Sequence, residues 1–199
     1  MQRAIQCFLN QTYQNRELLI LADGERVVDL AENANSNAPI RYIHIGDGAT
    51  IGEKRNLGSE LAQGEIIASW DDDDWSAPER LDDQVRRMMR NAVSVTSYHS
   101  MHFTDGSSWW KFSGSKTANL GTSLCYRKDW WDKHRFSPKQ IGEDGDFIRP
   151  AAAARQLSSE DAGLMLVASI HQHNTSKRQL QGKAWLKVLT PNIAGYQNI

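Results

Sequence analysis

The chain has 199 residues, enough for one domain with a substantial core, and its 23 basic residues nearly balance its 24 acidic residues. The formal net charge of −1 argues against a binder of nucleic acid or anionic lipid that is driven by overall charge. A hydrophobic share of 40% together with 14 glycines is typical of a globular domain and excludes a disordered chain. The two cysteines, Cys7 and Cys125, cannot form a disulfide framework and favour reduced thiols in a cytosolic protein. No segment has the roughly 18 apolar residues of a spanning helix, and the first residues lack an export signal.

Helix and strand patterns alternate in the first half of the chain. Apolar residues at helical spacing predict helices over residues 3–11, 25–35 and 54–63. Apolar runs predict buried strands over residues 17–22, 41–45 and 65–70, which is typical of parallel strands in an α/β domain. A fourth helix follows a capping-box pattern at Ser76 and Glu79. Its expected buried stripe consists of Leu81, Val85, Met88 and Met89.

The second half has the pattern of a strand meander with polar turns. The expected strands are residues 93–98, 107–112, 121–127 and 164–170. A short helix is expected over residues 129–133, and a loop at 142–147 leads into a helix that runs to about Leu157. The polar tail from Thr175 offers Trp185 and Leu189 as docking residues.

Four consecutive aspartates, Asp71–Asp74, form the strongest chemical signal in the sequence. They lie between the C-terminal end of a strand and a helix, at the edge of an α/β sheet where ligands bind. Because adjacent carboxylates repel one another, such a turn is solvated, placed at a helix N-terminus, or filled by a divalent cation. Its position favours the cation, since Mg²⁺ or Mn²⁺ usually meets a nucleotide through one or two carboxylates and the phosphate oxygens.

Two more groups lie at the same expected edge, and each has two interpretations. Asp23 ends an earlier strand, where it either accepts hydrogen bonds from a base or ribose or only turns the chain. Lys54 and Arg55 open a helix and either face a diphosphate or form a solvated helix face.

The second half carries two further candidates. Glu143 and Asp144 stand between glycines, so the backbone there can approach a ligand closely. A carboxylate beside an acceptor hydroxyl can act as a general base, whereas the alternative is a helix N-cap at Asp144. His171 and His173 have the i, i+2 spacing of metal ligands on one face, or are ordinary surface residues.

A set of short segments appears in one order along the chain. In the first half it comprises Leu9–Asn15, Glu17–Ile20, Asp23–Gly24, Gly52–Gly58, Ala62–Ala68, Asp71–Trp75 and Pro78–Leu81. The second half adds Gly121–Thr122, Gly142–Asp144 with Phe147, and His171–Ser176 as looser matches. This succession resembles the inverting family 2 glycosyltransferases of the GT-A fold, most closely over residues 3–90.

The resemblance implies a Rossmann-like, nucleotide-diphospho-sugar transferase fold, an α/β three-layer sandwich with a mainly parallel central sheet. It implies one domain with a nucleotide-sugar-binding half, residues 1–92, and an acceptor-binding half, residues 93–199. The implied enzyme is a hexosyltransferase-type glycosyltransferase whose donor is a nucleotide sugar, most often UDP-linked, and whose cofactor is Mn²⁺ or Mg²⁺. Its acceptor would be a saccharide or a lipid-linked molecule.

The resemblance also assigns donor and metal roles by position. Asp71–Asp73 match the family's Asp-X-Asp motif, with Asp73 as the direct metal ligand and Asp72 near the ribose. The implied metal residues are Asp73, Asp71 and His171. The implied nucleotide-binding residues are Asp23, Lys54, Arg55, Asp71 and Asp72.

On the acceptor side, Asp144 matches the acidic residue that acts as catalytic base, with Glu143 beside it. The implied mechanism follows from charge, because a bound cation neutralises the leaving nucleoside diphosphate while Asp144 takes the proton of an attacking hydroxyl. Attack on the opposite face of the anomeric carbon inverts its configuration. Trp109 and Trp110 are our candidates for an acceptor platform.

Three departures from the family pattern are expected to matter. The family begins with a hydrophobic strand, whereas this chain starts at the helix that follows it, so either the sequence is truncated at its start or the sheet compensates for the lack of that strand. Ala22 stands where the family has the first residue of an aspartate pair. Residues 93–199 form a short acceptor half, so no long membrane or polymerising extension is expected.

Other functions remain open on this evidence. A degenerate relative would bind a nucleotide without transferring sugar. A sugar nucleotidyltransferase needs a glycine-rich basic loop after its first strand, which the sequence lacks, and a structural Ca²⁺ module leaves Asp23 and Asp144 unexplained. We expect a cytoplasmic protein that reaches a membrane only peripherally, has no nucleic-acid partner, and is able to form a homo-oligomer.

Overall fold

The computed structural model of the protein describes residues 1–23, 39–117, 120–175 and 180–196. The helix expected over residues 25–35 lies outside these ranges. In chain order the elements are α1 (Gln2–Leu9), β1 (Leu18–Ala22), β2 (Ile40–His44), α2 (Ile51–Leu61), β3 (Ile66–Ala68), β4 (Trp75–Ser76), α3 (Arg80–Arg90), β5 (Val95–Thr104), β6 (Trp109–Ser113), the 3₁₀ turn η1 (Gly121–Ser123), β7 (Cys125–Arg127), α4 (Lys128–Lys133), α5 (Glu143–Ala153), β8 (Leu157–Asp161), β9 (Leu166–Ser169) and β10 (Trp185–Val188).

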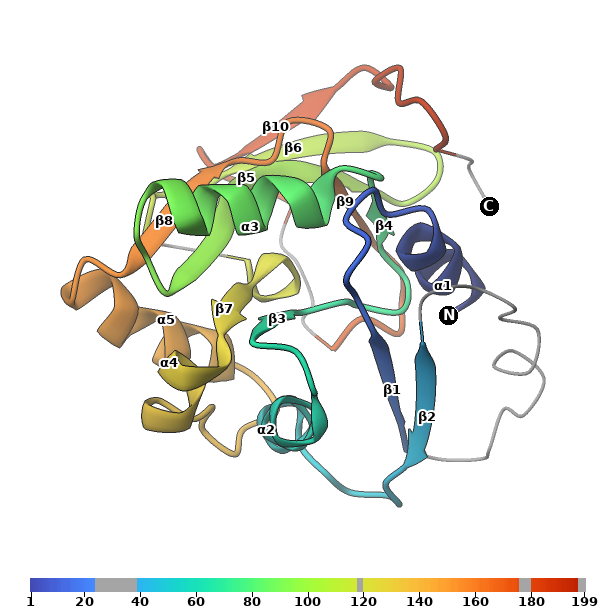
Figure 1. The fold of residues 1–199 in the computed structure, drawn as a ribbon. Helices are drawn as coiled ribbons and strands as arrows, with labels where there is room; N and C mark the ends of the chain where they lie inside the picture. The colour runs from blue at the N-terminus through green and yellow to red at the C-terminus, as the bar shows by residue number, and fades with distance from the viewer. Residues whose placement is uncertain (24–38, 118–119, 176–179, 197–199) are drawn as a thin grey trace.

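Strands β1 and β2 form a parallel two-stranded sheet of their own, with Leu18 opposite Ile40 and Ala22 opposite His44. Figure 1 shows this pair standing apart from the other strands. The parallel pairing expected from the two apolar runs is confirmed. Although β1 is apolar along its whole length, only Ala22 is buried, and the other four residues stay partly exposed.

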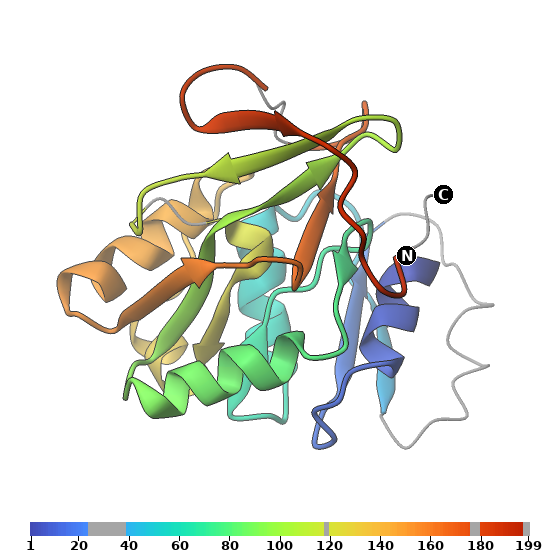
Figure 2. The same cartoon turned by 90° about the horizontal axis from the view of Figure 1, so that it is seen from above.

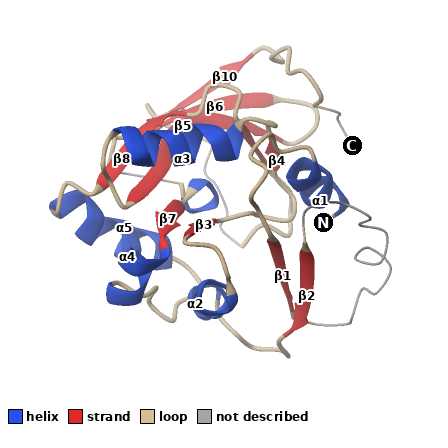
Figure 3. Cartoon of the chain, in the orientation of Figure 1, coloured by secondary structure: helices blue, strands red, loops and turns tan. Residues whose placement is uncertain are grey.

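The larger sheet has eight strands in the described ranges and is built around the long strand β5. Strand β5 pairs in parallel with β8 and β9, whereas its pairs with β6 and β7 are antiparallel. The pairs β3–β7, β4–β9 and β6–β10 are antiparallel as well. The fold is therefore α/β, but the expectation of a mainly parallel central sheet is wrong for these strands (Figure 3). Strand β3, for example, hydrogen-bonds in the antiparallel direction with β7 of the second half and does not extend the β1–β2 pair.

Two helical layers cover the sheet. Helix α3 runs along β5, as Figure 2 shows, and α4 and α5 pack beside β7 and β8. The core that involves α4 and α5 consists of Val95, Leu124, Tyr126, Trp131, Phe136, Phe147, Ile148 and Ala151. No helix of the described ranges is both long enough and apolar enough to cross a membrane.

Helix α3 turns a polar face inward. Its buried residues are Arg80, Gln84, Arg87 and Met88. Met89, expected in the buried stripe, is 57% exposed. The expected capping box is also absent, because Glu79 occupies the N-cap without a side-chain bond and Ser76 accepts a 2.8 Å hydrogen bond from Arg80 Nη1. Arg80 and Gln84 fit on this face because buried acceptors satisfy their donors: Arg80 donates to the carbonyls of Ser69 and Thr122, and Gln84 donates to that of Ser123.

Several boundaries of the second half differ from expectation. Helix α5 ends at Ala153, and Leu157 begins strand β8 instead of ending the helix. The polar tail contains a strand, β10, in which the Trp185 ring lies 4.9 Å from that of Phe103. Leu189 is 91% exposed, so its expected docking role is wrong. Both cysteines are free and buried.

Candidate active site

Three of the four consecutive aspartates form one cluster. A carboxylate oxygen from each of Asp71, Asp73 and Asp74 lies within 4.8 Å of the other two, whereas Asp72 is exposed and outside this group. We call these three residues the acidic cluster. They follow β3, and β4 begins directly after Asp74 and pairs with β9. The turn is therefore fastened to the larger sheet at both ends.

Asp74 is the buried member of the acidic cluster. Its carboxylate accepts hydrogen bonds from the Thr122 hydroxyl at 2.6 Å and from the Ser169 backbone N–H at 2.9 Å. Burial raises the pKa of Asp74 to about 8, and the negative charges of Asp71 and Asp73 add to the shift. Three crowded carboxylates are an unfavourable arrangement by themselves, and they offer the oxygen ligands that Mg²⁺ and Mn²⁺ prefer.

His171, in the loop after β9, lies directly on the acidic cluster. Its Nε2 is 2.7 Å from Asp73 Oδ2, and the Asn174 side-chain amide donates to the same oxygen at 3.3 Å. The side-chain oxygen Oδ1 of Asn174 accepts the His171 backbone N–H at 2.6 Å, which fixes the loop. The structure thus brings His171 to Asp73, while His173 donates its backbone N–H to His171 Nδ1.

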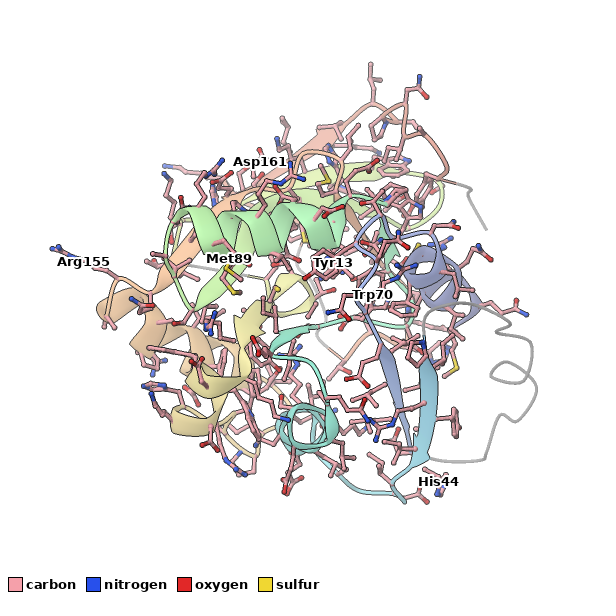
Figure 4. The ribbon with its side chains drawn as sticks, viewed as in Figure 1. Tyr13, His44, Trp70, Met89, Arg155 and Asp161 are labelled. Atoms are coloured by element: carbon pink, nitrogen blue, oxygen red, sulfur yellow. The ribbon has the colours of Figure 1, made fainter. Side chains whose placement is uncertain are left out.

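The Arg80 side chain holds the segments on either side of the acidic cluster by hydrogen bonds. This fully buried guanidinium donates to the carbonyls of Ser69 at 2.8 Å and Thr122 at 2.9 Å, and to the Ser76 hydroxyl at 2.8 Å. It also lies 4.7 Å from the ring centroid of Trp70, which is labelled in Figure 4. Because these partners belong to the end of β3, to β4 and to η1, a single side chain ties together three segments around the acidic cluster.

The candidate base lies at the start of α5, on the other side of η1. Helix α5 begins at Glu143, after Gly142 in the left-handed region with a φ of 87°. A Cβ built at Gly121 would lie 2.5 Å from Asp144 Oδ2 and 3.1 Å from Arg55 Nη2, so these groups approach the backbone of η1 closely. Arg55 Nη1 lies 2.8 Å from Glu143 Oε1.

Electrostatics connects this region with the acidic cluster. Burial raises the pKa of Glu143, while the positive charge of Arg55 opposes the shift. The negative charge of Asp71 acts on Glu143 too, and Arg55 acts on Asp71. The acidic cluster and the candidate base are therefore near neighbours, with Arg55 between them.

Two nucleotide-binding candidates pair with each other. The ammonium of Lys54, in α2, contacts the Asp23 carboxylate directly after β1. This hydrogen bond lowers the pKa of Asp23. Helix α2 is held at its start by a capping box between Thr50 and Glu53, which sets the direction of Lys54 and Arg55.

Comparison with known proteins decides the family. A sequence model of the family described as "Glycosyl transferase family 2" matches residues 1–144. The chain belongs to glycosyl transferase family 2. An uncharacterized glycosyltransferase of Haemophilus influenzae is 31% identical over 91 residues, which make up 44% of this chain and 36% of that protein. Another uncharacterized glycosyltransferase, of Rickettsia conorii, is 33% identical over 103 residues, or 50% of this chain and 17% of that protein.

Solved structures share the fold. S. aureus TarS 1–349 in complex with UDP-GlcNAc aligns with a TM-score of 0.70 at 15% identity, over 86% of this chain and 55% of that one. The same protein in complex with UDP aligns with a TM-score of 0.69 at 15% identity, over 84% of this chain and 56% of that one. This chain therefore spans about half the length of the solved structures, and its matches cover at most about a third of those two curated relatives.

One acceptor candidate of this family 2 chain needs correction. Trp109 is 2% exposed and packs with Trp75 and Tyr196, with its ring 5.1 Å from that of Tyr196. Its faces are covered, so Trp109 cannot serve as an acceptor platform. Trp110 is half-buried beneath Lys187, whose Nζ lies 5.8 Å from the ring centroid, and its role stays a prediction.

Three residues around the family 2 site, Asp74, Arg80 and Thr122, received no individual role from the sequence. Asp74 belongs to the predicted acidic turn, but the metal ligands named individually there are Asp71 and Asp73. Arg80 and Thr122 lie in segments that carry the family resemblance, but nothing in the sequence assigns them a role, since an arginine in a helix and a threonine in a loop are ordinary surface residues in most sequences. Their importance is visible only from their burial and partners.

Proposed function

We propose that this chain is a metal-dependent inverting glycosyltransferase that moves a sugar from a UDP-sugar to an acceptor hydroxyl. The observation that carries the proposal is the arrangement of the acidic cluster, His171 and Asp144 around η1. Thr122 bonds the acidic cluster, and the neighbouring Gly121 is packed against Asp144. The proposed diphosphate site at the acidic cluster and the proposed hydroxyl site at Asp144 therefore both contact η1.

The donor side is assigned to residues 1–92, with Asp23, Lys54 and Asp72 as nucleotide contacts. TarS, a structural neighbour, was crystallised with UDP-GlcNAc and with UDP, and this supports a UDP-linked donor here. Lys54 already neutralises Asp23, so a nucleotide base or ribose meets a paired carboxylate.

The acidic cluster fits a divalent cation in the chemistry of its ligands. Bound Mn²⁺ or Mg²⁺ supplies positive charge that stabilises the leaving nucleoside diphosphate. Asp71 and Asp73 present carboxylate oxygens at the surface of the turn, and Thr122 and Ser169 keep Asp74 oriented. His171 holds Asp73 in place through their 2.7 Å contact.

The acceptor side is assigned to residues 93–199. Asp144 accepts the proton of the attacking hydroxyl, and attack from the face opposite the leaving group inverts the anomeric carbon. The acceptor in this proposal is a saccharide or a lipid-linked molecule. Trp110 remains the aromatic candidate.

Release of UDP from UDP-GlcNAc tests this function without a known acceptor, because water replaces the acceptor hydroxyl. We expect slow release in the presence of Mn²⁺, and a loss of about 100-fold or more in Asp144→Asn. Asp129→Asn, which changes an exposed carboxylate of α4, is the matched control and keeps the wild-type rate. Equal rates in Asp144→Asn and wild type contradict the assigned base. Binding of UDP with no release, and with no transfer to any acceptor in a panel, identifies instead a degenerate relative that only binds nucleotides.

A further inference from the structure

We propose that Arg55 is a positioning residue for the general base: it holds Glu143 and thereby seats Asp144 against η1, and it does not bind the donor. This inference rests on the proposed function. It departs from the role that sequence position implies for Arg55, which is contact with the nucleotide. Asp144 is the residue that touches the reacting hydroxyl, and Arg55 acts through the first turn of α5.

The first support is the ion pair between Arg55 and Glu143. Nη1 and Oε1 lie 2.8 Å apart, and only 16% of the Arg55 side chain and 6% of the Glu143 side chain is exposed. The contact is one of charge, because the Nη1 hydrogens are not aligned on an acceptor. Removing one partner from such a buried pair leaves an uncompensated charge, which is strongly unfavourable, so the pair holds Arg55 at Glu143.

The second support is the packing that fixes the Arg55 side chain. Its guanidinium carbon lies 5.5 Å from the ring centroid of Phe136, and the Phe136 ring stacks on Phe147 of α5 with centroids 4.2 Å apart. The neighbouring Asn56 donates to the Phe136 carbonyl at 2.9 Å and accepts its N–H at 3.0 Å. Helix α2 is thereby fastened to the segment that supports α5, with Arg55 between the two.

The third support is the lack of room around η1. The Cβ position of Gly121 is within 3.1 Å of both Asp144 and Arg55, so the two side chains meet the η1 backbone at the same point. When Arg55 moves toward a donor, Glu143 loses its counter-charge in a buried place, and the first turn of α5 must shift. The position of Asp144 therefore depends on Arg55.

The test compares three variants: Arg55→Ala, Arg55→Lys and, as matched control, Arg90→Ala. Arg90 also pairs with a glutamate, Glu160, but its side chain is 64% exposed. Three quantities are measured: the Kd of UDP with Mn²⁺ by calorimetry, the rate of UDP release from UDP-GlcNAc, and backbone hydrogen exchange at residues 146–149 of the ligand-free protein.

We expect Arg55→Ala to keep the Kd of UDP within about threefold of the wild-type value. The rate of UDP release from UDP-GlcNAc should fall by about 100-fold, because a misplaced general base loses most of its catalytic contribution. Hydrogen exchange at residues 146–149 becomes about tenfold faster, because the turn has lost its anchor. Arg55→Lys keeps a cation near Glu143 and restores part of the rate and the protection. Arg90→Ala leaves all three quantities unchanged.

Two results overturn the proposal. One is a loss of UDP affinity in Arg55→Ala that matches the loss of rate, which assigns Arg55 to the donor. The other is unchanged hydrogen exchange at residues 146–149 in ligand-free Arg55→Ala, which shows that Arg55 does not hold the first turn of α5. This conclusion does not depend on the enzymatic activity. If the wild type binds no nucleotide at all, the proposed function fails, and the exchange comparison still decides the part that Arg55 has in seating α5.

Discussion

Arg80 and Thr122 lie 42 positions apart in the chain and are joined by a 2.9 Å hydrogen bond from Arg80 Nη2 to the Thr122 carbonyl. The Thr122 hydroxyl in turn donates to Asp74 at 2.6 Å. A fully buried side chain of α3 is thus one residue removed from the acidic cluster. Residues that never touch a donor therefore determine where the carboxylates lie.

Replacement of Arg80 by Met tests this framework. Arg80→Met leaves the carbonyls of Ser69 and Thr122 without their buried donor, so we expect the free energy of unfolding to fall by about 3 kcal/mol. Urea denaturation followed by fluorescence measures the change. The control Arg86→Met alters an exposed arginine of the same helix and should stay within about 0.5 kcal/mol of wild type. Equal effects of the two substitutions would show that the buried bonds contribute little.

Removal of one hydroxyl tests the link between η1 and the acidic cluster. Thr122→Val keeps the shape of the side chain and deletes the donor to Asp74, so Asp74 loses part of its orientation. We expect the Kd of Mn²⁺, measured with UDP present, to rise by about 10-fold. Thr190→Val, at an exposed position, is the control and leaves the Kd unchanged. An unaltered Kd in Thr122→Val contradicts a role for this hydroxyl.

The acidic turn, the parallel pairing of β1 with β2, and helix α2 could be predicted from sequence because their signals are local. A run of aspartates after an apolar strand, two separate strand patterns, and apolar residues at helical spacing each depend on neighbours in the chain. The predicted start of the helix at Lys54 is late, because the Thr50–Glu53 capping box begins α2 at Ile51. The base region had a weaker local signal, the glycines around Glu143 and Asp144.

What the sequence could not show depends on distant partners. The antiparallel pairing of β3 with β7 joins segments that are far apart in the chain, and no local pattern encodes it. The inward face of α3 carries Arg80 and Gln84, and such residues count as solvent-facing in a hydrophobicity pattern until their buried acceptors are known. Trp109 illustrates the opposite error, since an indole expected to meet a ligand is covered by core residues.

A methyl group at Gly121 tests the close approach of η1 to the base. Gly121→Ala places a Cβ 2.5 Å from Asp144 Oδ2, so the carboxylate must move. We expect the rate of UDP release from UDP-GlcNAc to fall by about 100-fold or more, whereas UDP binding persists. Gly64→Ala is the matched control, because its nearest atom, the Ile66 carbonyl oxygen, is at an ordinary 3.4 Å. A wild-type rate in Gly121→Ala would falsify the assigned position of Asp144.

The buried thiol of Cys125 gives a prediction about pH. Burial raises the pKa of Cys125 from 9.0 to about 11, so the folded state holds the proton over a range in which the unfolded state releases it. The stabilisation that this proton gives is complete below pH 9 and is lost as the pH rises toward 11, by up to about 3 kcal/mol. Denaturation at pH 8, 9, 10 and 11 should show a steeper loss for wild type than for Cys125→Ala. Parallel curves for the two proteins contradict the shift.

The central claim, a donor site built on the acidic cluster, is tested most directly by thermal unfolding of wild type and Asp73→Ala with UDP, GDP, CDP or dTDP, each with and without Mn²⁺. A ligand at about 100 times its Kd stabilises the folded state by about 2.7 kcal/mol, which is a shift of a few degrees for a chain of this size. The account predicts that UDP raises the melting temperature of the wild type only when Mn²⁺ is present, and that Asp73→Ala abolishes the shift. Stabilisation by Ca²⁺ alone, with no effect of any nucleotide, would contradict the account and make the acidic cluster a structural site.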